Sequence, residues 1–144
     1  MTMNTRQKSI LLIDDDSLVA NSLARMLRSK HLDVSICPDP KSALAFCDRM
    51  KFDLIITDQR MPVMTGTEFA AEVKDKQPQA RCILISGYSD CASVIDAFNK
   101  EHIHQHVSKP WDNSYLLKVV DEQIQLGEEG KTTEREPLRL VANF

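Results

Sequence analysis

The sequence predicts an α/β fold in which a parallel sheet is covered by helices on both faces. Five short apolar runs alternate with five longer amphipathic segments along the 144 residues. Alternation at this spacing is typical of strand–helix–strand units, whose right-handed crossovers place successive strands parallel. Several of the runs contain almost only Ile, Leu and Val, as strands buried on both faces do. The length suits one domain.

Each predicted strand is a short run rich in β-favouring residues. The five strands are expected at residues 10–13, 33–37, 53–57, 81–85 and 103–107. The first, third and fourth are the most apolar, which places them in the middle of the sheet. The fifth is more polar, and this suits an edge strand.

The amphipathic segments between the strands predict helices, because their apolar residues recur with a helical period. The helices are expected at residues 17–30, 40–50, 66–76, 89–99 and 112–125. Leu18 in the first and Cys91 in the fourth fit the inner face of their helix. Pro40 suits a first helical turn, while Asp16 and Asp112 or Asn113 suit N-caps.

The predicted domain covers residues 9–126, with a short N-terminal lead over 1–8. From 127 to 144 a polar linker is followed by a short apolar tail. This segment is either a disordered tail or linker, or a segment that docks on a partner or on its own domain.

Composition and charge restrict the compartment and the partners. No apolar run approaches the roughly 20 residues of a membrane span, and the polar N-terminus lacks the apolar stretch of a signal peptide. We therefore expect a cytoplasmic protein without membrane contact. The net charge of −3 argues against direct binding to nucleic acid, which needs a basic face.

Acidic residues end two of the predicted strands. Asp58 closes the run 54–57, and Asp14 and Asp15 follow the run 10–13. In open parallel sheets ligands bind at the carboxyl ends of the strands, where the strand order reverses. In the flavodoxin-like order 2-1-3-4-5 the first and third strands are neighbours at that point, so these carboxylates share one crevice. Carboxylate oxygens with room for water suit Mg²⁺.

Two further strand ends supply a hydroxyl and an ammonium group. Ser86 ends the fourth strand and Lys109 follows the fifth. A metal ion and a lysine neutralise an incoming phosphoryl group, and catalysis of its transfer is mainly positioning and electrostatics. Asp58 is then the nucleophile that accepts the phosphoryl group.

These residues carry a family resemblance. Over about residues 9–126 the sequence resembles the receiver domain of bacterial two-component response regulators. The matching runs are Ile10–Asp16, Asp58-Gln-Arg-Met-Pro-x-Met-x-Gly66, Ser86-Gly87-Tyr88 and Lys109-Pro110-Trp111. The residues of these motifs are similar to those of receivers attached to HD-GYP-type cyclic-di-GMP phosphodiesterases and to hydrogenase-type transcriptional regulators.

The resemblance implies phosphorelay signal transduction. A histidine kinase or phosphotransfer protein would donate the phosphoryl group to Asp58, and Ser86 and Lys109 would respond to it. The output would be a further domain or a partner protein, with a homodimer as one form, and no external substrate would be turned over. The resemblance also implies a cis peptide bond before Pro110 and a Mg²⁺ site made by Asp14, Asp15, Asp58 and the backbone carbonyl of Arg60.

Three positions depart from the common receiver pattern. His106 stands where receivers carry an aromatic switch residue, and unlike that residue it titrates near neutrality; it is either a switch or a partly exposed strand histidine. Arg60 and Tyr88 are bulky, and the resemblance implies that they flank the path of the hydrolytic water. They either shield the acyl phosphate and slow dephosphorylation, or point away towards solvent or a partner.

Two other functions stay open at this point. One is a constitutive protein-interaction module with a vestigial phosphosite. The other is a small nucleotide binder or hydrolase, which is disfavoured because no glycine-rich phosphate loop follows the first strand.

Overall fold

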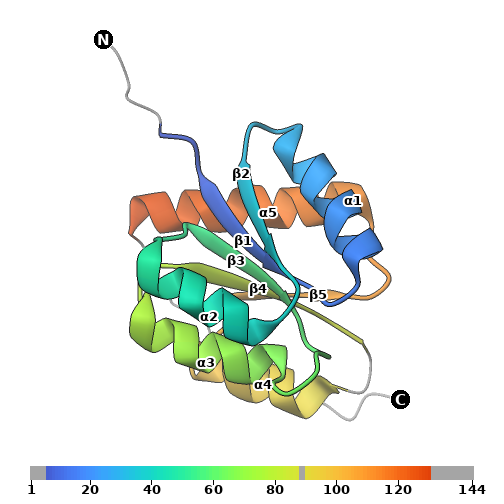
Figure 1. Ribbon diagram of the computed structural model, residues 1–144, viewed down its shortest axis with the longest axis vertical. Helices are drawn as coiled ribbons and strands as arrows, with labels where there is room; N and C mark the ends of the chain where they lie inside the picture. The colour runs from blue at the N-terminus through green and yellow to red at the C-terminus, as the bar shows by residue number, and fades with distance from the viewer. Residues whose placement is uncertain (1–5, 88–89, 131–144) are drawn as a thin grey trace.

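The computed structural model describes residues 6–87 and 90–130, in which a five-stranded parallel sheet lies between two layers of helices (Figure 1). The strands are β1 (Ser9–Ile13), β2 (Asp33–Cys37), β3 (Leu54–Asp58), β4 (Arg81–Ser86) and β5 (Gln105–Ser108). The helices are α1 (Ser17–Arg28), α2 (Pro40–Arg49), α3 (Gly66–Lys76), α4 (Cys91–Asn99) and α5 (Asn113–Glu129). The strand order β2-β1-β3-β4-β5 confirms the predicted flavodoxin-like sheet.

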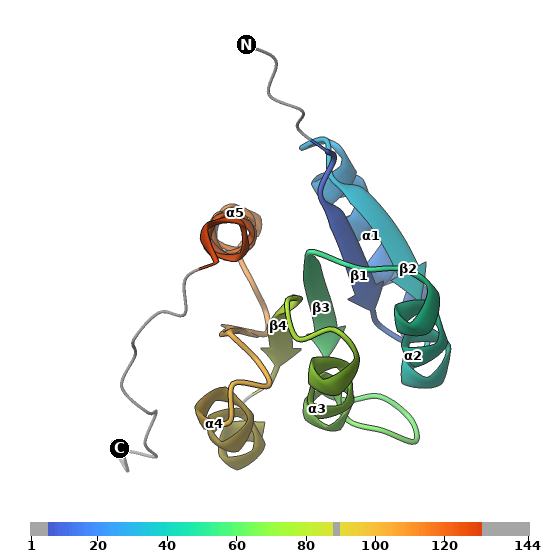
Figure 2. The same ribbon diagram turned by 90° about the vertical axis from the view of Figure 1, so that its left-hand side faces the viewer.

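Helices α1 and α5 cover one face of the sheet, and α2, α3 and α4 cover the other (Figure 2). Successive side chains of a strand point to opposite faces. Ile10 and Leu12 of β1 therefore pack in the core with α1 and α5, while Leu11 and Ile13 pack with α2, α3 and α4. This explains why the central strands are apolar at every position.

The helix N-termini are capped largely as the sequence predicts. The carboxylate of Asp16 accepts the N–H groups of Leu18 and Val19 at 3.0 and 3.3 Å, and Asp112 caps α5. Such caps pair backbone donors that have no partner within the helix. The cap of α1 fixes the direction in which the chain leaves β1.

Helix α5 is longer than predicted and extends into the expected polar linker. Gly127 lies inside the helix, where an added Cβ would stand 3.3 Å from Cγ of Arg81 at the start of β4. The glycine therefore serves close packing of α5 across the sheet rather than a chain break. The helix ends at Gly130, whose φ of 63° is typical of a left-handed C-terminal cap. Residues 131–144, which hold the rest of the predicted tail, lie outside the described residues.

Three further predictions on the elements are wrong in detail. Strand β5 begins at Gln105 because Ile103 belongs to the turn after α4, where its N–H donates to the carbonyl of Ala97. Leu18 is 81% exposed and Cys91 is exposed as well. Both lie in the first turn of a helix, ahead of the residues that pack on the sheet. Among the described residues, no helix combines the length and the apolar character that a bilayer crossing requires.

Candidate functional site

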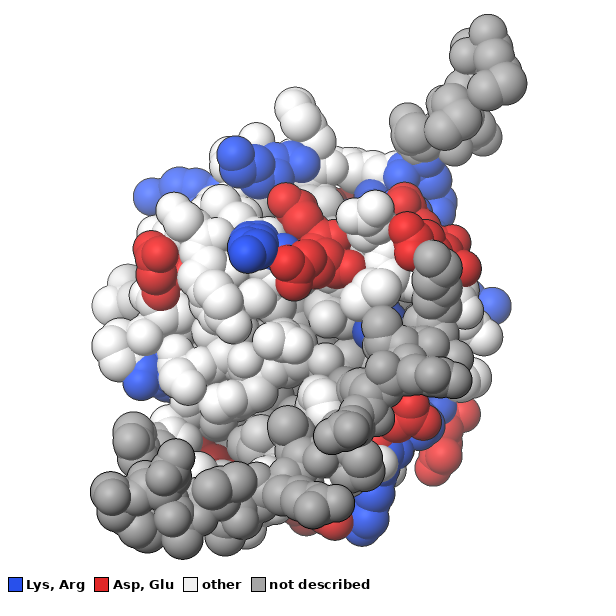
Figure 3. All heavy atoms as spheres, turned by 180° about the vertical axis from the view of Figure 1, so that it is seen from behind, with Lys and Arg blue, Asp and Glu red and all other residues white. Residues whose placement is uncertain are grey.

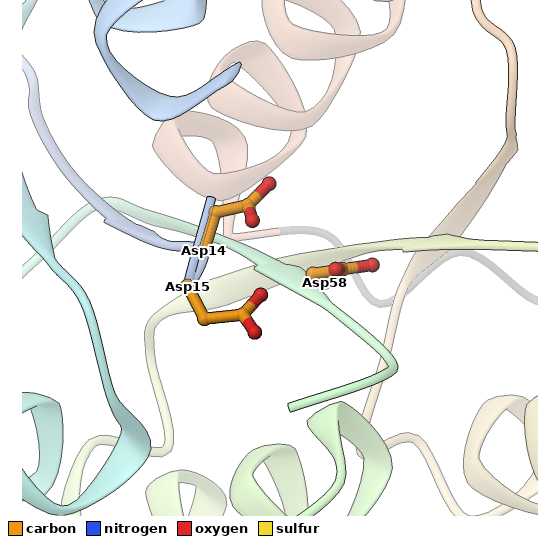
Figure 4. A group of neighbouring side chains, drawn as sticks. All are labelled: Asp14, Asp15 and Asp58. Carbon is orange, nitrogen blue, oxygen red and sulfur yellow. The ribbon is translucent and has the colours of Figure 1, made fainter. Parts of the chain in front are cut away.

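The carboxyl ends of β1 and β3 bring three acidic side chains together. Ile13 of β1 pairs with Thr57 of β3, so Asp14 and Asp58 follow at neighbouring strand ends. Figure 4 shows the carboxylates of Asp14 and Asp15 pointing towards the side on which Asp58 lies, and one oxygen from each of the three lies within 4.8 Å of the others. The shared crevice predicted from the sequence is present.

Asp58 is a buried carboxylate held by a lysine and a backbone amide. The residue is 5% exposed, and its Oδ1 lies 2.8 Å from Nζ of Lys109 and accepts the N–H of Gln59 at 2.9 Å. A buried carboxylate is tolerated only when it is paired in this way. Oδ1 takes both of these contacts and Oδ2 takes neither.

Asp14 carries the clearest electrostatic cost in the site. Burial raises the pKa of its carboxyl group, the hydrogen bond from the Asp16 N–H lowers it, and the negative charge of Asp58 raises it again. The net direction is upward, which means that the ionised form is disfavoured. Hard oxygen ligands of this kind fit Mg²⁺, whose charge would remove that cost.

The loop after β3 is fastened to the start of α3. An added Cβ on Gly66 would stand only 2.3 Å from the carbonyl oxygen of Asp58, so only glycine fits there. The Gly66 N–H donates to the carbonyl of Gln59, and the side-chain oxygen of Gln59 accepts the N–H of Thr67. These contacts fix the backbone of Gln59, the residue that directly precedes Arg60.

Val63 gives this loop an unusual backbone conformation. Its φ is 74°, and the Met64 N–H donates to the Pro62 carbonyl at 2.8 Å, which closes a three-residue turn. Turns of this kind are rare and strained, and a β-branched residue at positive φ adds to the strain. The side chain is also fully exposed, so no packing within the domain offsets the cost.

Ser86 ends β4 and His106 lies within the neighbouring strand β5, and the two side chains are hydrogen-bonded. The Ser86 Oγ is 2.6 Å from Nε2 of His106, and Ser86 is buried. Burial lowers the pKa of His106, and the negative charge of Asp90 works in the opposite direction. The structure thus joins the predicted hydroxyl to the predicted switch position.

Asp90 is a residue of the site that sequence reasoning missed. Its Oδ1 lies 3.4 Å from Nη2 of Arg60, and its Oδ2 accepts the N–H of Gly87 at 3.2 Å. It stands at the N-cap of α4, and an acidic residue four positions after Ser86 was the available signal. Tyr88, the other predicted shielding residue, lies outside the described residues.

The remaining wall of the site comes from the chain after β5. The Lys109–Pro110 peptide bond is cis, as the resemblance implies. Trp111 is partly buried and packs on the core with α1 and α5. A groove runs from the carboxylates to this residue, lined by Asp14, Asp15, Asp58, Val19, Lys109 and Trp111.

Comparison with known proteins identifies the family. The response regulator receiver domain model matches residues 10–121, and the chain belongs to that family. The predicted fold and the function in phosphorelay signal transduction are thereby confirmed. Members of the family are generally non-catalytic apart from phosphorylation of their own aspartate, and they typically use Mg²⁺, with which the acidic cluster is compatible.

The similar proteins include hydrogenase-type transcriptional regulators, one of the two sub-families that the sequence resembles. The hydrogenase transcriptional regulatory protein HoxA of Cupriavidus necator is 33% identical over 125 residues, which are 85% of this chain and 25% of that protein. The transcriptional regulatory protein FixJ of Rhizobium meliloti is 25% identical over 78% of this chain and 55% of its own. The chain thus spans about a quarter of the length of the HoxA regulators and about half of FixJ.

Solved structures agree on the fold. The signal receiver domain of an HD domain-containing protein from Pseudomonas fluorescens has a TM-score of 0.84 and 25% identity, covering 90% of this chain and 96% of that one. A CheY-like receiver domain protein from Methanospirillum hungatei has a TM-score of 0.82 and 24% identity, covering 88% and 100%. The latter supports the fold alone.

Proposed function

We propose that Asp58 accepts a phosphoryl group from a histidine kinase or phosphotransfer protein, and that the chain then switches a protein-interaction surface. The observation that supports this most directly is the buried Asp58 carboxylate, held by Lys109 beside two further carboxylates. Such a cluster is costly for stability unless a cation and a phosphoryl group use it.

The proposed reaction is a direct displacement at phosphorus. Oδ2 of Asp58 forms the new O–P bond while the P–N bond to the donor histidine breaks. The leaving imidazole keeps the electron pair of that bond and takes up a proton. Lys109, 2.8 Å from Oδ1, stabilises the negative charge that gathers on the phosphoryl oxygens.

The chain's own oxygen atoms suit a Mg²⁺ site. We assign Asp14, Asp15, Asp58 and the backbone carbonyl of Arg60 as its protein ligands. When bound, the ion would neutralise charge on the transferring phosphoryl group. The raised pKa of Asp14 supports this assignment, because a carboxylate that is disfavoured without a cation gains most from one.

Ser86 and His106 form the proposed switch. A phosphoryl group on Asp58 offers strong acceptor oxygens to the Ser86 hydroxyl, which in the structure is bonded to His106. Movement of the hydroxyl towards the phosphoryl group would break this bond and free the His106 ring to change position. The surface around α4, β5 and α5 would change with it.

Arg60 and Tyr88 are proposed to slow the loss of the phosphoryl group. Arg60 lies two residues after Asp58, and its side chain forms an ion pair with Asp90 in the segment after β4. We expect the spontaneous dephosphorylation of Arg60→Asn and Tyr88→Ala to be faster than that of the parent, measured as loss of label after donor removal. Unchanged rates in both variants would contradict shielding.

An apolar groove beside the site is proposed to receive the phosphodonor protein. It is lined by Val19, Met26 and Trp111 together with the strongly exposed Leu18. Large exposed apolar residues next to a reactive site favour a protein interface. Basic and acidic side chains are interspersed on the face shown in Figure 3, where the described residues form no basic stripe.

The output is proposed to lie in protein contacts made by the switched surface. In HoxA and FixJ the receiver is one part of a longer transcriptional regulator, and a linked output domain or a separate partner would serve here in the same way. A homodimer through the switched surface is the third form of output, and its formation on phosphorylation can be measured by sedimentation.

The test of the proposed function is Mg²⁺-dependent labelling by a small phosphodonor such as acetyl phosphate. We expect the parent and Asp48→Ala, which removes an exposed acid on α2, to be labelled equally. Asp58→Ala should take up no label. Labelling that persists in Asp58→Ala would contradict the acceptor assignment. No labelling of the parent would favour a constitutive interaction module.

A further inference from the structure

Gln59, the residue directly after the acceptor, is a buried polar residue whose main chain is held on both sides. It is only 4% exposed. Its N–H donates to Oδ1 of Asp58 and to the carbonyl of Ile85 in β4, each at 2.9 Å. Its own carbonyl accepts the N–H of Gly66 at 2.9 Å. One residue thus contacts the acceptor carboxylate, the neighbouring strand and the start of α3.

The Gln59 side chain is bound to a single residue in the first turn of α3. Its Oε1 accepts the N–H of Thr67 at 2.8 Å, and its Nε2 donates to the Thr67 hydroxyl oxygen at 3.2 Å. Two contacts to one residue hold the amide in one orientation. A buried amide lowers stability unless it is hydrogen-bonded, so a position that served packing alone would favour an apolar residue.

Helix α3 also has a cap that does not involve Gln59. The Thr65 hydroxyl oxygen accepts the N–H of Glu68, and the Glu68 carboxylate accepts the N–H of Thr65. This reciprocal pair is a capping box, which satisfies donors that have no partner within the helix. The side chain of Gln59 therefore ties the acceptor loop to a helix start that has its own cap.

We propose that the Gln59 side chain is a positioning group for phosphoryl transfer: anchored on Thr67, it keeps the Gln59 N–H on Oδ1 of Asp58 and so fixes the orientation of the acceptor carboxylate. The proposal rests on the proposed function of Asp58. The side chain touches no reacting atom and acts through its own main chain.

The shared N–H of Gln59 explains why an anchor matters. One donor is divided between Asp58 and the Ile85 carbonyl at equal distances. Hydrogen bonds weaken steeply as they bend, so a small rotation of this peptide towards β4 would give the proton to Ile85 and withdraw it from Asp58. A side chain held twice by Thr67 restricts that rotation.

The orientation of the Asp58 carboxylate matters for the transfer itself. Oδ1 is held by the Gln59 N–H and by Lys109 at 2.8 Å, and together these contacts limit rotation of the carboxylate. Oδ2, the oxygen proposed to form the O–P bond, then keeps one direction. Reactions are faster when the reacting atoms are aligned beforehand, and a misplacement of roughly 1 Å can cost a hundredfold in rate. Loss of one contact should therefore lower the maximal rate rather than weaken donor binding.

Phosphorylation by acetyl phosphate at saturating Mg²⁺ tests the proposal, followed by the fluorescence of Trp111, the only tryptophan, which lines the same groove as Asp58. Gln59→Met keeps the side-chain length and removes the amide. We expect its maximal rate to fall by about tenfold, with the half-saturating donor concentration changed by less than about twofold. Thr67→Val loses only the hydroxyl contact and should fall less, while Thr67→Ser should keep the parent's rate.

Two control variants separate positioning from stability. Gln123→Met removes another buried amide, which accepts twice from Arg81 at the amino end of the sheet, and it should lower stability without changing the rate. Thr65→Ala removes the cap of α3 but leaves both contacts between Gln59 and Thr67, and we expect the same result. If Thr65→Ala slowed phosphorylation as much as Gln59→Met, the amide would act only as part of the helix cap and the proposal would be overturned. A Gln59→Met variant with the parent's rate would overturn it as well.

A spectroscopic measurement reports on the acceptor directly and does not depend on Gln59→Met folding. The carboxyl ¹³C resonance of Asp58, recorded without donor, should move in Thr67→Val and stay in place in Thr65→Ala. An unmoved resonance in Thr67→Val would overturn the proposal. A parent protein that acetyl phosphate does not label at all would instead contradict the proposed function, so the two failures are distinguishable.

Discussion

Polar groups are paired differently at the two ends of the sheet. At the amino ends of the strands, the Gln77 side chain accepts the Phe52 N–H at 2.8 Å and donates to the carbonyls of Cys47 and Met50 at 3.0 and 2.6 Å. Arg81 at the start of β4 donates twice to the side-chain oxygen of Gln123. Each polar group there is matched by another from the same chain.

At the carboxyl ends, like charges are gathered instead. Asp14 and Asp58 are both buried and lie beside Asp15, with the ammonium group of Lys109 as the cation in contact with Asp58. Such an arrangement lowers stability. The polar groups at the amino end therefore stabilise the fold. The clustered carboxylates at the carboxyl end lower its stability, and an added cation and phosphoryl group would relieve their repulsion.

The largest expected effect is at the amino end. Gln77→Ala removes three hydrogen bonds and leaves buried backbone groups without partners, so we expect the free energy of unfolding to fall by about 2–4 kcal/mol. Urea denaturation measures it. Gln79→Ala, at an exposed position of the same turn, should change stability little. Equal losses of stability in the two variants would contradict the conclusion that matched polar groups stabilise the amino end.

The next largest effect is a gain in stability at the carboxyl end of the sheet. Asp14→Asn removes a disfavoured charge while an amide oxygen can still accept the Asp16 N–H. Without Mg²⁺ we expect the variant to be more stable by about 1 kcal/mol. Added Mg²⁺ should stabilise the parent more than the variant, and thermal unfolding with and without the ion measures both. Asp16→Asn keeps its cap and is the control; a destabilised Asp14→Asn would contradict the prediction.

Backbone strain gives a smaller effect at the same end. Val63→Gly relieves a β-branched residue at positive φ, and the gain in stability should be about 0.5–1 kcal/mol after the entropic cost of glycine. Glu101 lies after α4 at the amino end and also has a positive φ, of 60°, but it is not β-branched. The matched change Glu101→Gly should therefore increase stability less than Val63→Gly does. Chemical denaturation of both variants compares them, and a larger gain at Glu101 would reverse the ranking.

The smallest effect is a pH dependence. The pKa of His106 is lowered, chiefly by burial, so protonation favours the unfolded state. The contribution of neutral His106 to the free energy of unfolding is therefore fully present above pH 6.5, the ordinary pKa of histidine. It is lost as the pH falls below that value. Stability measured between about pH 7.5 and 5.5 should fall less steeply in His106→Gln than in the parent. His102→Gln removes a second histidine of lowered pKa at the amino end and should act in the same direction. A steeper fall in His106→Gln would contradict the sign.

The sequence predicted what depends on local pattern. Apolar runs placed the strands, and an acid or a hydroxyl after each run placed Asp14, Asp58 and Ser86 at one end of the sheet. Asp90 had a local signal, its position as an acidic residue four residues after Ser86, but its contact with Arg60 joins loops after two different strands and was missed. The length of α5 was missed because Gly127 reads as a chain break, whereas its role depends on the packing of Arg81.

Gly66 gives the domain a fixed side and a movable side. With no room for even a methyl group between the start of α3 and the carbonyl of Asp58, the acceptor strand and α3 must travel as one rigid piece. The side of the domain formed by α4 and β5 is joined to the site by side-chain contacts, between Arg60 and Asp90 and between Ser86 and His106. A partner bound to α3 would therefore see the same surface before and after phosphorylation, whereas one bound to α4 would read the signal. A fluorescent label meant to report the state of the molecule belongs on α4, and one meant as a silent reference belongs on α3.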